Sequence, residues 1–571
     1  MNISLLDLTR EPKIAYFSME IGIRNDIPTY SGGLGILAGD TIKTCADLKL
    51  PVVAVTLVTK KGYFRQELDA NGRQTEYPVC WDPSKYMTLL PNKTTVQIEG
   101  RDVMIQAWIR DVKSLTGGNV PIFFLDTDVE GNTAEDREIT SYLYGGDIAY
   151  RFKQEIVLGI GGIRMLHELG FEIKKYHMNE GHSSLLTIEL LNRFKRPIEE
   201  VWDEKLVWDI ERVKDLCVFT THTPVEAGHD KFPYDLVSMI LGEPIPLNVL
   251  KSLGGHDSLN MTRLGFNLSE FINGVAKKHG EVSRNMFPGY EISAITNGVH
   301  TYTWTCDSFK KLYDEYLPGW ANEPELFVRV GRIPNEEVWN AHMEAKKILL
   351  NYVRENTGVE MSPDILTIGF ARRATAYKRA HLLFSDIERL ERIGAGKIQI
   401  IYAGKAHPKD ESGKGLIEKI FSIKERLKEK IKIAYLQNYD MDIALKMVSG
   451  VDVWLNTPLR PLEASGTSGM KAAHNGVLNF SVLDGWWIEG HIEGFTGWSI
   501  GPSPTEITLT DNMDTRDADD LYNKLENIII PLFYNDRDAW FRMMQNVIGK
   551  NAYYFNSHRM MRRYVTEAYI R

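Results

Sequence analysis

Five apolar runs in the second half of the sequence constrain the fold most strongly. They are rich in β-branched residues and occupy 365–371, 397–404, 432–437, 451–457 and 477–483. Each run is apolar nearly throughout and does not alternate with polar residues, which is typical of parallel strands covered on both faces. Helical patterns at 377–394 and 415–430 separate the first three runs. This alternation predicts βαβ units and a doubly wound α/β sheet.

The first half of the sequence predicts a second α/β domain. Its shorter apolar runs occupy 13–19, 51–58, 121–127 and 217–223, with glycine-rich loops and helical patterns between them. The span 306–364 is predicted to connect the two domains through a long amphipathic helix, and the last helix of the chain is predicted to open at Asn556 or Ser557. We expect one domain at 1–305 and another at 306–571, facing each other across a deep cleft. Ligands bind beyond the carboxyl ends of parallel strands, so loops of both domains should line that cleft.

Composition narrows the class of protein. The 571 residues carry a net charge of −9 without a long basic tract, which argues against nucleic acid as the main partner. The four cysteines are far apart and form no CxxC pair, which favours free thiols in a reducing compartment. The sequence has no signal-peptide pattern and no apolar run of about 18 residues. We therefore expect a cytoplasmic protein without a membrane span.

Two loops combine glycine or cations with a predicted helix start. In YSGGLGILAGD (30–40), Gly32, Gly33 and Gly35 precede a helix predicted to begin near Ile36, an arrangement that attracts anions. Its spacing is neither a Walker loop nor a complete GxGxxG, so a structural turn is an equal alternative. FARRATAYKRAHLLF (370–384) gathers four cations between a predicted strand and a predicted helix. Because the helix dipole disfavours cations there, the cluster favours a bound phosphate over a solvated face.

A third loop carries a single lysine. In EASGTSGMKAAHNG (463–476), glycines and hydroxyls precede a short predicted helix whose first turn contains Lys471. Taken alone, the loop allows a tight turn, and it is also suited to hold a phosphate through its hydroxyls and backbone N–H groups. A lysine in this position either pairs with a bound phosphate or carries pyridoxal phosphate, and the residues alone leave both alternatives open.

Three further loops carry groups that bind sugar hydroxyls. The stretches 177–186, 220–230 and 295–304 each place Asn, His or Glu after an apolar run. A metal site is the rival interpretation, but no HExxH or other tight ligand spacing occurs, so we expect no metal. A glycosidase needs two placed carboxyls, for which Glu180, Glu226 and Glu463 are the candidates, and the sequence does not reveal such a pair.

Taken together, the motifs resemble a known family. EASGTSGMK closely resembles the pyridoxal-phosphate lysine motif of the α-glucan phosphorylases, the glycogen and maltodextrin phosphorylase family. GGLGILAGD, NEGHSSL, TTHTPVEAG, TNGVHTYTW, RRATAYKR and YAGKAHP resemble its other blocks in the family's order, over positions 18–485. The chain is similar to the compact prokaryotic form. The resemblance implies a GT-B-like architecture of two Rossmann-like, doubly wound domains. It also implies reversible phosphorolysis of α-1,4-glucans to α-glucose 1-phosphate with retention of configuration.

The resemblance also implies the parts of the active site. Pyridoxal 5′-phosphate is expected as a Schiff base on Lys471, with its 5′-phosphate as the working group. The partners are an α-glucan, inorganic phosphate and glucose 1-phosphate, and a homodimer is a further expectation. Cofactor binding is assigned to Lys471, Gly466, Thr467, Ser468, Arg372 and Trp304. Phosphate binding and catalysis are assigned to Arg373, Lys378, His222 and Gly33. Contacts to glucose are assigned to Glu463, Ala464, Ser465, Tyr377, Asn297 and His222.

Two positions depart from the long members of the family. Gly22 stands where they place an aromatic hydroxyl near the pyridine ring, and Asp440 stands where they place an arginine. Some cofactor contacts should therefore differ. A nucleotide-sugar-dependent glucan synthase of similar architecture is the first rival, and a non-catalytic glucan-binding protein is the second. The lysine motif argues against the synthase, and Arg373, Lys378 and Lys471 together argue against the binding protein.

Overall fold

The computed structural model describes residues 8–201, 204–503 and 512–570, and its first half is built on a mixed sheet. Among these residues, nine strands form that sheet. In spatial order they are β13 (Ser293–Ala294), β12 (Phe271–Gly274), β9 (Cys217–Thr220), β8 (Ile173–Asn179), β1 (Lys13–Ser18), β2 (Val52–Leu57), β7 (Asn119–Asp126), β6 (Arg101–Lys113) and β5 (Thr88–Ile98). The pairs from β13 to β7 are parallel, and β6 and β5 add an antiparallel edge.

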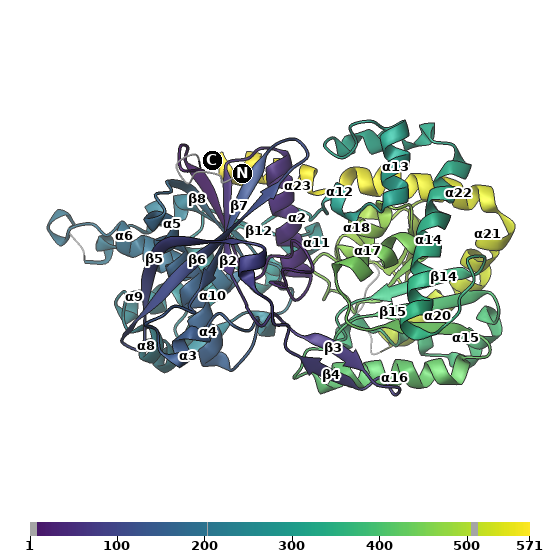
Figure 1. Cartoon of the computed structure of the whole chain (residues 1–571), viewed down its shortest axis with the longest axis horizontal. Helices are drawn as coiled ribbons and strands as arrows, with labels where there is room; N and C mark the ends of the chain where they lie inside the picture. The colour runs from purple at the N-terminus through teal and green to yellow at the C-terminus, as the bar shows by residue number, and fades with distance from the viewer. Residues whose placement is uncertain (1–7, 202–203, 504–511, 571) are drawn as a thin grey trace.

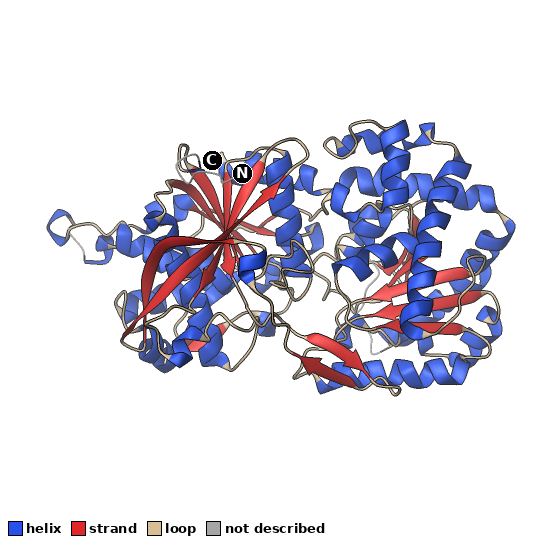
Figure 2. Ribbon diagram, in the orientation of Figure 1, coloured by secondary structure: helices blue, strands red, loops and turns tan. Residues whose placement is uncertain are grey.

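The second half contains a parallel sheet, drawn at the right of Figure 1. Its order in the described chain is β16 (Lys432–Leu436), β15 (Ile398–Ala403), β14 (Leu366–Ala371), β17 (Val453–Asn456), β18 (Leu478–Val482) and β19 (Gly497–Ile500). The first five strands lie within the five predicted runs, so the prediction of parallel strands is confirmed there. Strands β14, β15 and β18 are buried along their whole length, which requires cover on both faces. Helices surround both sheets (Figure 2).

One helix prediction was wrong over half of its length. Residues 377–394 were expected to be a single helix, but the chain makes two short 3₁₀ turns, Ala376–Lys378 and Leu382–Phe384, before α15 (Ile387–Gly394). Arg379 has a left-handed backbone (φ +48) that interrupts the helix. Its guanidinium donates to the carbonyls of Thr457 and Pro458, which fixes this turn beside strand β17. The other helical pattern corresponds to α16 (Glu411–Leu427).

A β-hairpin of the first half contacts the second half. The hairpin of β3 (Arg65–Leu68) and β4 (Gln74–Tyr77) extends from the first half to the second half, beside α16 (Figure 1). Gln66 and Gln74 of this hairpin exchange hydrogen bonds with the backbone of Gly404, Ala406 and Asn438.

The end of the chain returns to the first half. Helix α23 (Ser557–Tyr564) begins after Asn556, whose side chain accepts from the N–H of Arg559, so the predicted cap is confirmed. Met560, Met561 and Tyr564 pack into the core around α2 (Gly33–Asp47). The long amphipathic helix is α14 (Asn335–Thr357), which packs on α13 (Asp307–Tyr316) and α17 (Met441–Gly450). Every helix within the described ranges is too short or too polar to cross a membrane.

Candidate active site

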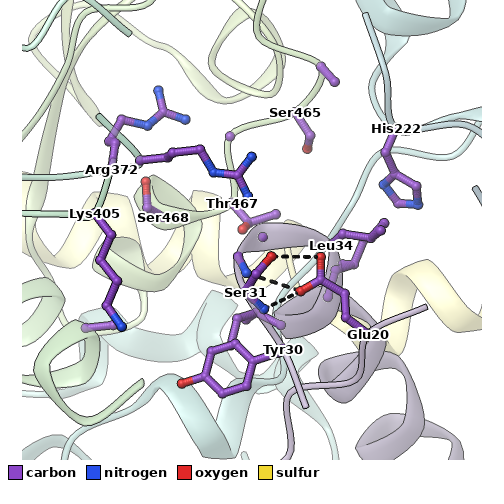
Figure 3. Close-up of a pocket in the computed structure, with 18 of the residues that line it drawn as sticks. Glu20, Tyr30, Ser31, Leu34, His222, Arg372, Lys405, Ser465, Thr467 and Ser468 are labelled. Carbon is purple, nitrogen blue, oxygen red and sulfur yellow. Dashed lines mark hydrogen bonds between the residues drawn. The ribbon is translucent and has the colours of Figure 1, made fainter. Parts of the chain in front are cut away.

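A cavity of about 650 Å³ is lined by loops from both halves of the chain. The loops after β8 and β9 approach it from the first sheet, and the loops after β14 and β17 approach it from the second. Carboxyl ends of strands from two sheets therefore meet at one cavity, as expected for α/β sheets. All the residues assigned to the site through the family resemblance line it. Figure 3 shows part of this lining.

The cationic loop after β14 contributes two cations that share one carboxylate. Nη1 of Arg372 lies 2.6 Å and Nζ of Lys378 lies 2.7 Å from Oε2 of Glu463. Burial opposes ionisation of Glu463, but the two cations outweigh it and hold its pKa at about 2. Glu463 is thus a carboxylate at neutral pH. It pairs with Arg372, which is assigned to the cofactor, and with Lys378, which is assigned to phosphate.

The other two cations of the loop diverge. Arg373 is exposed in the cavity lining, and a Cβ on Gly32 would lie 3.2 Å from its Nη2 atom. Arg379 is buried outside the lining and pairs with Asp514 and Asp517. Because no helix starts at this loop, the helix-dipole argument for its phosphate preference was wrong. The charge argument remains for Arg372, Arg373 and Lys378, which line the same cavity.

A second buried carboxyl, that of Asp484, binds the backbone at Glu463. The backbone N–H of Glu463 donates to Asp484 Oδ2 at 2.8 Å, and the N–H of Gly485 donates to Oδ1 at 2.9 Å. Burial raises the pKa of Asp484 to about 7, despite these two N–H groups. Asp484 therefore titrates near neutral pH directly below the residue that pairs with Arg372 and Lys378.

The glycine loop of the first half forms the opposite wall. Helix α2 begins at Gly33, three residues earlier than predicted, so Gly33 and Gly35 belong to its first turn. Gly33 is exposed, and a Cβ there would meet no atom within 4 Å, so its backbone is open to the cavity. Glu20 fixes the loop by accepting from the N–H groups of Ser31 and Gly32, at 2.5 and 3.2 Å (Figure 3).

The lysine loop places its amine against an aromatic ring. Helix α18 (Ser468–Ala473) carries Lys471, and Nζ lies 3.8 Å from the centroid of the Trp304 ring. Burial is the largest influence and lowers the Lys471 pKa to about 8. Gly466 has φ +82, a conformation that glycine adopts without strain, where the loop turns toward this helix. The hydroxyl of Ser468 accepts from Nε1 of Trp454 at 3.1 Å.

The first half also presents polar groups suited to a sugar. His222 Nε2 lies 2.6 Å from Oδ1 of Asn179, and burial lowers the His222 pKa to about 3, so the ring is neutral. Glu180 orders this loop by accepting from the N–H of His222 and the hydroxyl of Thr223. Oδ1 of Asn297 is buried without a hydrogen-bond partner in the described chain. It is an acceptor that a ligand hydroxyl can satisfy.

Sequence reasoning missed several lining residues. Glu20, Tyr144 and Arg151 line the cavity from the first half, and Lys405 and Tyr439 line it from the second. Lys405 belongs to the recognised motif YAGKAHP, and Glu20 stands two residues before Gly22, but neither side chain was given a role. The carboxylates weighed for hydrolysis do not assemble as a group. Glu180 and Glu463 line the cavity on different halves, and Glu226 lies outside its lining.

The chain is similar in sequence to several known proteins. A family described as "Carbohydrate phosphorylase" matches residues 246–495. The chain is 42% identical to a maltodextrin phosphorylase of Thermococcus litoralis, over 98% of this chain and 70% of the relative. It is 36% identical to a glycogen phosphorylase of Aquifex aeolicus, over 98% of this chain and 86% of the relative. It is 37% identical to a glycogen phosphorylase of Mycobacterium tuberculosis, over 97% of this chain and 70% of the relative.

Proposed function

The chain belongs to the carbohydrate phosphorylase family, and from that premise we propose that it catalyses the reversible phosphorolysis of α-1,4-glucans. Inorganic phosphate would cleave the terminal glucosidic bond and give α-glucose 1-phosphate, with retention of configuration, and a glucan shorter by one unit. One observation carries this proposal. A buried lysine amine, the exposed cation Arg373, the paired cations Arg372 and Lys378, and neutral sugar-binding groups all line one cavity.

We propose that the two sheets are the cores of two Rossmann-like domains in a GT-B-like arrangement. The first would extend over residues 1–305 and the second over 306–571. The two separate sheets and the cavity at their carboxyl ends support this division. Helix α23 would then belong to the second domain by sequence but pack against α2 of the first domain.

The residues around Lys471 fit pyridoxal phosphate. The amine of Lys471 faces the cavity, Arg372 supplies positive charge, and Gly466 and Thr467 supply a backbone turn suited to a phosphate. Nη1 of Arg372 makes an ion pair with Glu463 but no aligned hydrogen bond within the described part of the chain, so it can donate to a further anion. When bound to Lys471 through its aldehyde, the cofactor would supply its 5′-phosphate as the group that supports proton transfer by the substrate phosphate.

The substrate phosphate would bind between the two halves. Arg373 and Lys378 would hold it from the second half, and the backbone N–H of Gly33, in the first turn of α2, would hold it from the first. The proximity of Arg373 to Gly32 supports this arrangement, because it brings a cation to the start of a helix. The cations would stabilise the negative charge on phosphate as the glycosidic bond breaks.

The glucosyl group would lie against His222, Asn297 and the turn Glu463–Ser465. Neutral His222 and the unpartnered Asn297 oxygen are suited to hydroxyl groups. Tyr377, whose ring lies 4.4 Å from Nζ of Lys378, would border both sugar and phosphate. Backbone dipoles near His222 would stabilise an oxocarbenium-like glucosyl group above the phosphate.

Spectroscopy and a coupled assay test this function. The purified protein should show the absorbance band of lysine-bound pyridoxal phosphate and should form glucose 1-phosphate from maltodextrin only when phosphate is present. Lys471→Ala should lose both the band and the activity. Transfer of glucose from a nucleotide sugar, without dependence on phosphate or the band, would instead identify a glucan synthase and refute the proposal.

A further inference from the structure

A buried carboxylate connects helix α2 to the amine of Lys471 through the indole of Trp304. Asp40 is 1% exposed, and its two carboxylate oxygens accept from Nε1 of Trp304 at 3.0 and 2.8 Å. The face of the same ring lies 3.8 Å from Nζ of Lys471. The three side chains thus form a continuous series from an anion, through an aromatic ring, to an amine.

Two charged side chains of α2 act on the Lys471 amine with opposite sign. Burial has the largest effect and lowers the Lys471 pKa. Asp40 raises this pKa and Lys43 lowers it, and the resulting value is about 8. The pKa of Lys43 is itself lowered by burial and raised by Asp40 and Asp47. Asp40 therefore acts on two amines, that of buried Lys471 and that of half-buried Lys43.

The geometry can act on the amine in two ways. A carboxylate at the N–H edge of an indole fixes the orientation of the ring, and it makes the ring face more negative toward a cation. Its charge also favours the protonated amine directly. The simpler interpretation is that Asp40 only satisfies the N–H of a buried tryptophan. The two interpretations differ in whether the charge of Asp40, and not merely its oxygen, matters to Lys471.

We propose that Asp40 is a positioning residue for Lys471, which orients Trp304 beneath the amine and places a carboxylate at the far edge of the same ring. The proposal rests on the proposed function of Lys471 as the residue that carries the cofactor. Only a neutral amine attacks an aldehyde, so Asp40 would set how readily Lys471 accepts the cofactor. None of the motifs recognised in the sequence assigns a role to Asp40.

Competitive acetylation of the full chain, freed of cofactor, tests this proposal. The rate at which acetic anhydride modifies Lys471 is measured by mass spectrometry across pH. The wild-type midpoint should be near 8. Asp40→Asn keeps an oxygen acceptor for Trp304 but removes the charge. Its midpoint should fall by about one unit, which raises acetylation at pH 7 about five-fold.

Lys43→Met is the matched control, because it removes the opposite charge from the same helix. Its midpoint should rise, and acetylation of Lys471 at pH 7 should fall about two-fold or more. An unchanged midpoint in Asp40→Asn, or a shift in the same direction in both variants, would overturn the proposal. If circular dichroism shows that Asp40→Asn does not fold, Asp40→Ser removes the same charge and should give the same downward shift.

A second readout separates this inference from the proposed function. At pH 7, Asp40→Asn should take up pyridoxal phosphate about five-fold faster than the wild-type chain, as followed by absorbance. If the wild-type chain takes up none, the proposed cofactor is wrong, and the acetylation midpoints still decide the role of Asp40. If the wild-type chain takes up the cofactor, but Asp40→Asn shows neither faster uptake nor a lower acetylation midpoint, the inference on Asp40 fails and the proposed function stands.

Discussion

Replacing Glu463 by glutamine should remove the one carboxylate that two cations of the cavity wall share. In the folded chain, Glu463 pairs with Arg372 and Lys378 at 2.6 and 2.7 Å. Glu463→Gln keeps the shape of the side chain but removes its charge. Two buried cations then remain without their common anion, which is the costly way to break a buried ion pair.

The magnitude follows from the Glu463 pKa. Its fall from 4.5 to about 2 corresponds to about 3 kcal/mol of stabilisation of the charged form. Because folding lowers this pKa, the contribution is present above about pH 4.5 and is lost as the pH falls toward 2. At pH 7 the variant should therefore have a free energy of unfolding lower by about 3 kcal/mol.

Thermal and denaturant unfolding with and without inorganic phosphate provide the assay. Phosphate should restore much of the lost stability of Glu463→Gln, since a ligand that binds only the folded state stabilises it. The wild-type chain should respond less, because its carboxylate shares the same two cations. Glu463→Asp, which keeps the charge, is the control, with chloride at equal ionic strength. A variant as stable as wild type without phosphate, and no more responsive to phosphate, would refute the assignment of these cations to anion binding.

Other substitutions test separate parts of the molecule. Lys378→Ala should lower phosphorolysis about 10²–10³-fold while leaving the cofactor absorbance band in place, and a wild-type rate would remove Lys378 from the phosphate site. Folding raises the pKa of Asp484 to about 7, so the wild-type chain should lose stability as the pH rises from about 4 to about 7. In Asp484→Asn the unfolding midpoint should decline less over this pH range. The same decline in both chains would contradict this prediction. Gln66→Ala should lower the free energy of unfolding by about 1–3 kcal/mol, because the buried carbonyl of Gly404 and the part-buried amide of Asn438 lose their partner. An unchanged urea midpoint would argue against that role for the hairpin.

The sequence predicted five strands of the second sheet, β14 to β18, because these buried strands are apolar nearly throughout. It did not predict β19, which is also buried but is only four residues long and contains glycine and serine. In the first sheet it did not predict the antiparallel strands β6 and β5, the second of which forms the edge, and in which only one face is buried. The error at 377–394 has a tertiary cause. The Arg379 guanidinium binds carbonyls beside β17, and these long-range contacts override the local helical pattern.

The location of the candidate site was predictable because its motifs follow strands whose carboxyl ends converge. The pairing inside the site was not. Glu463 was expected to face sugar, but its contact with Arg372 and Lys378 depends on how the loops after β14 and β17 approach each other. Asp40 lies in the middle of an ordinary helical pattern, and only the packing of α2 against Trp304 reveals its contact.

Phosphorus NMR of the full chain with maltodextrin and inorganic phosphate tests the central claim most directly. The account predicts that the phosphate signal declines only when glucan is present. It also predicts that α-glucose 1-phosphate appears in equal amount, and that Lys471→Ala abolishes the conversion. Release of free glucose with the phosphate signal unchanged, or formation of the β anomer, would contradict it.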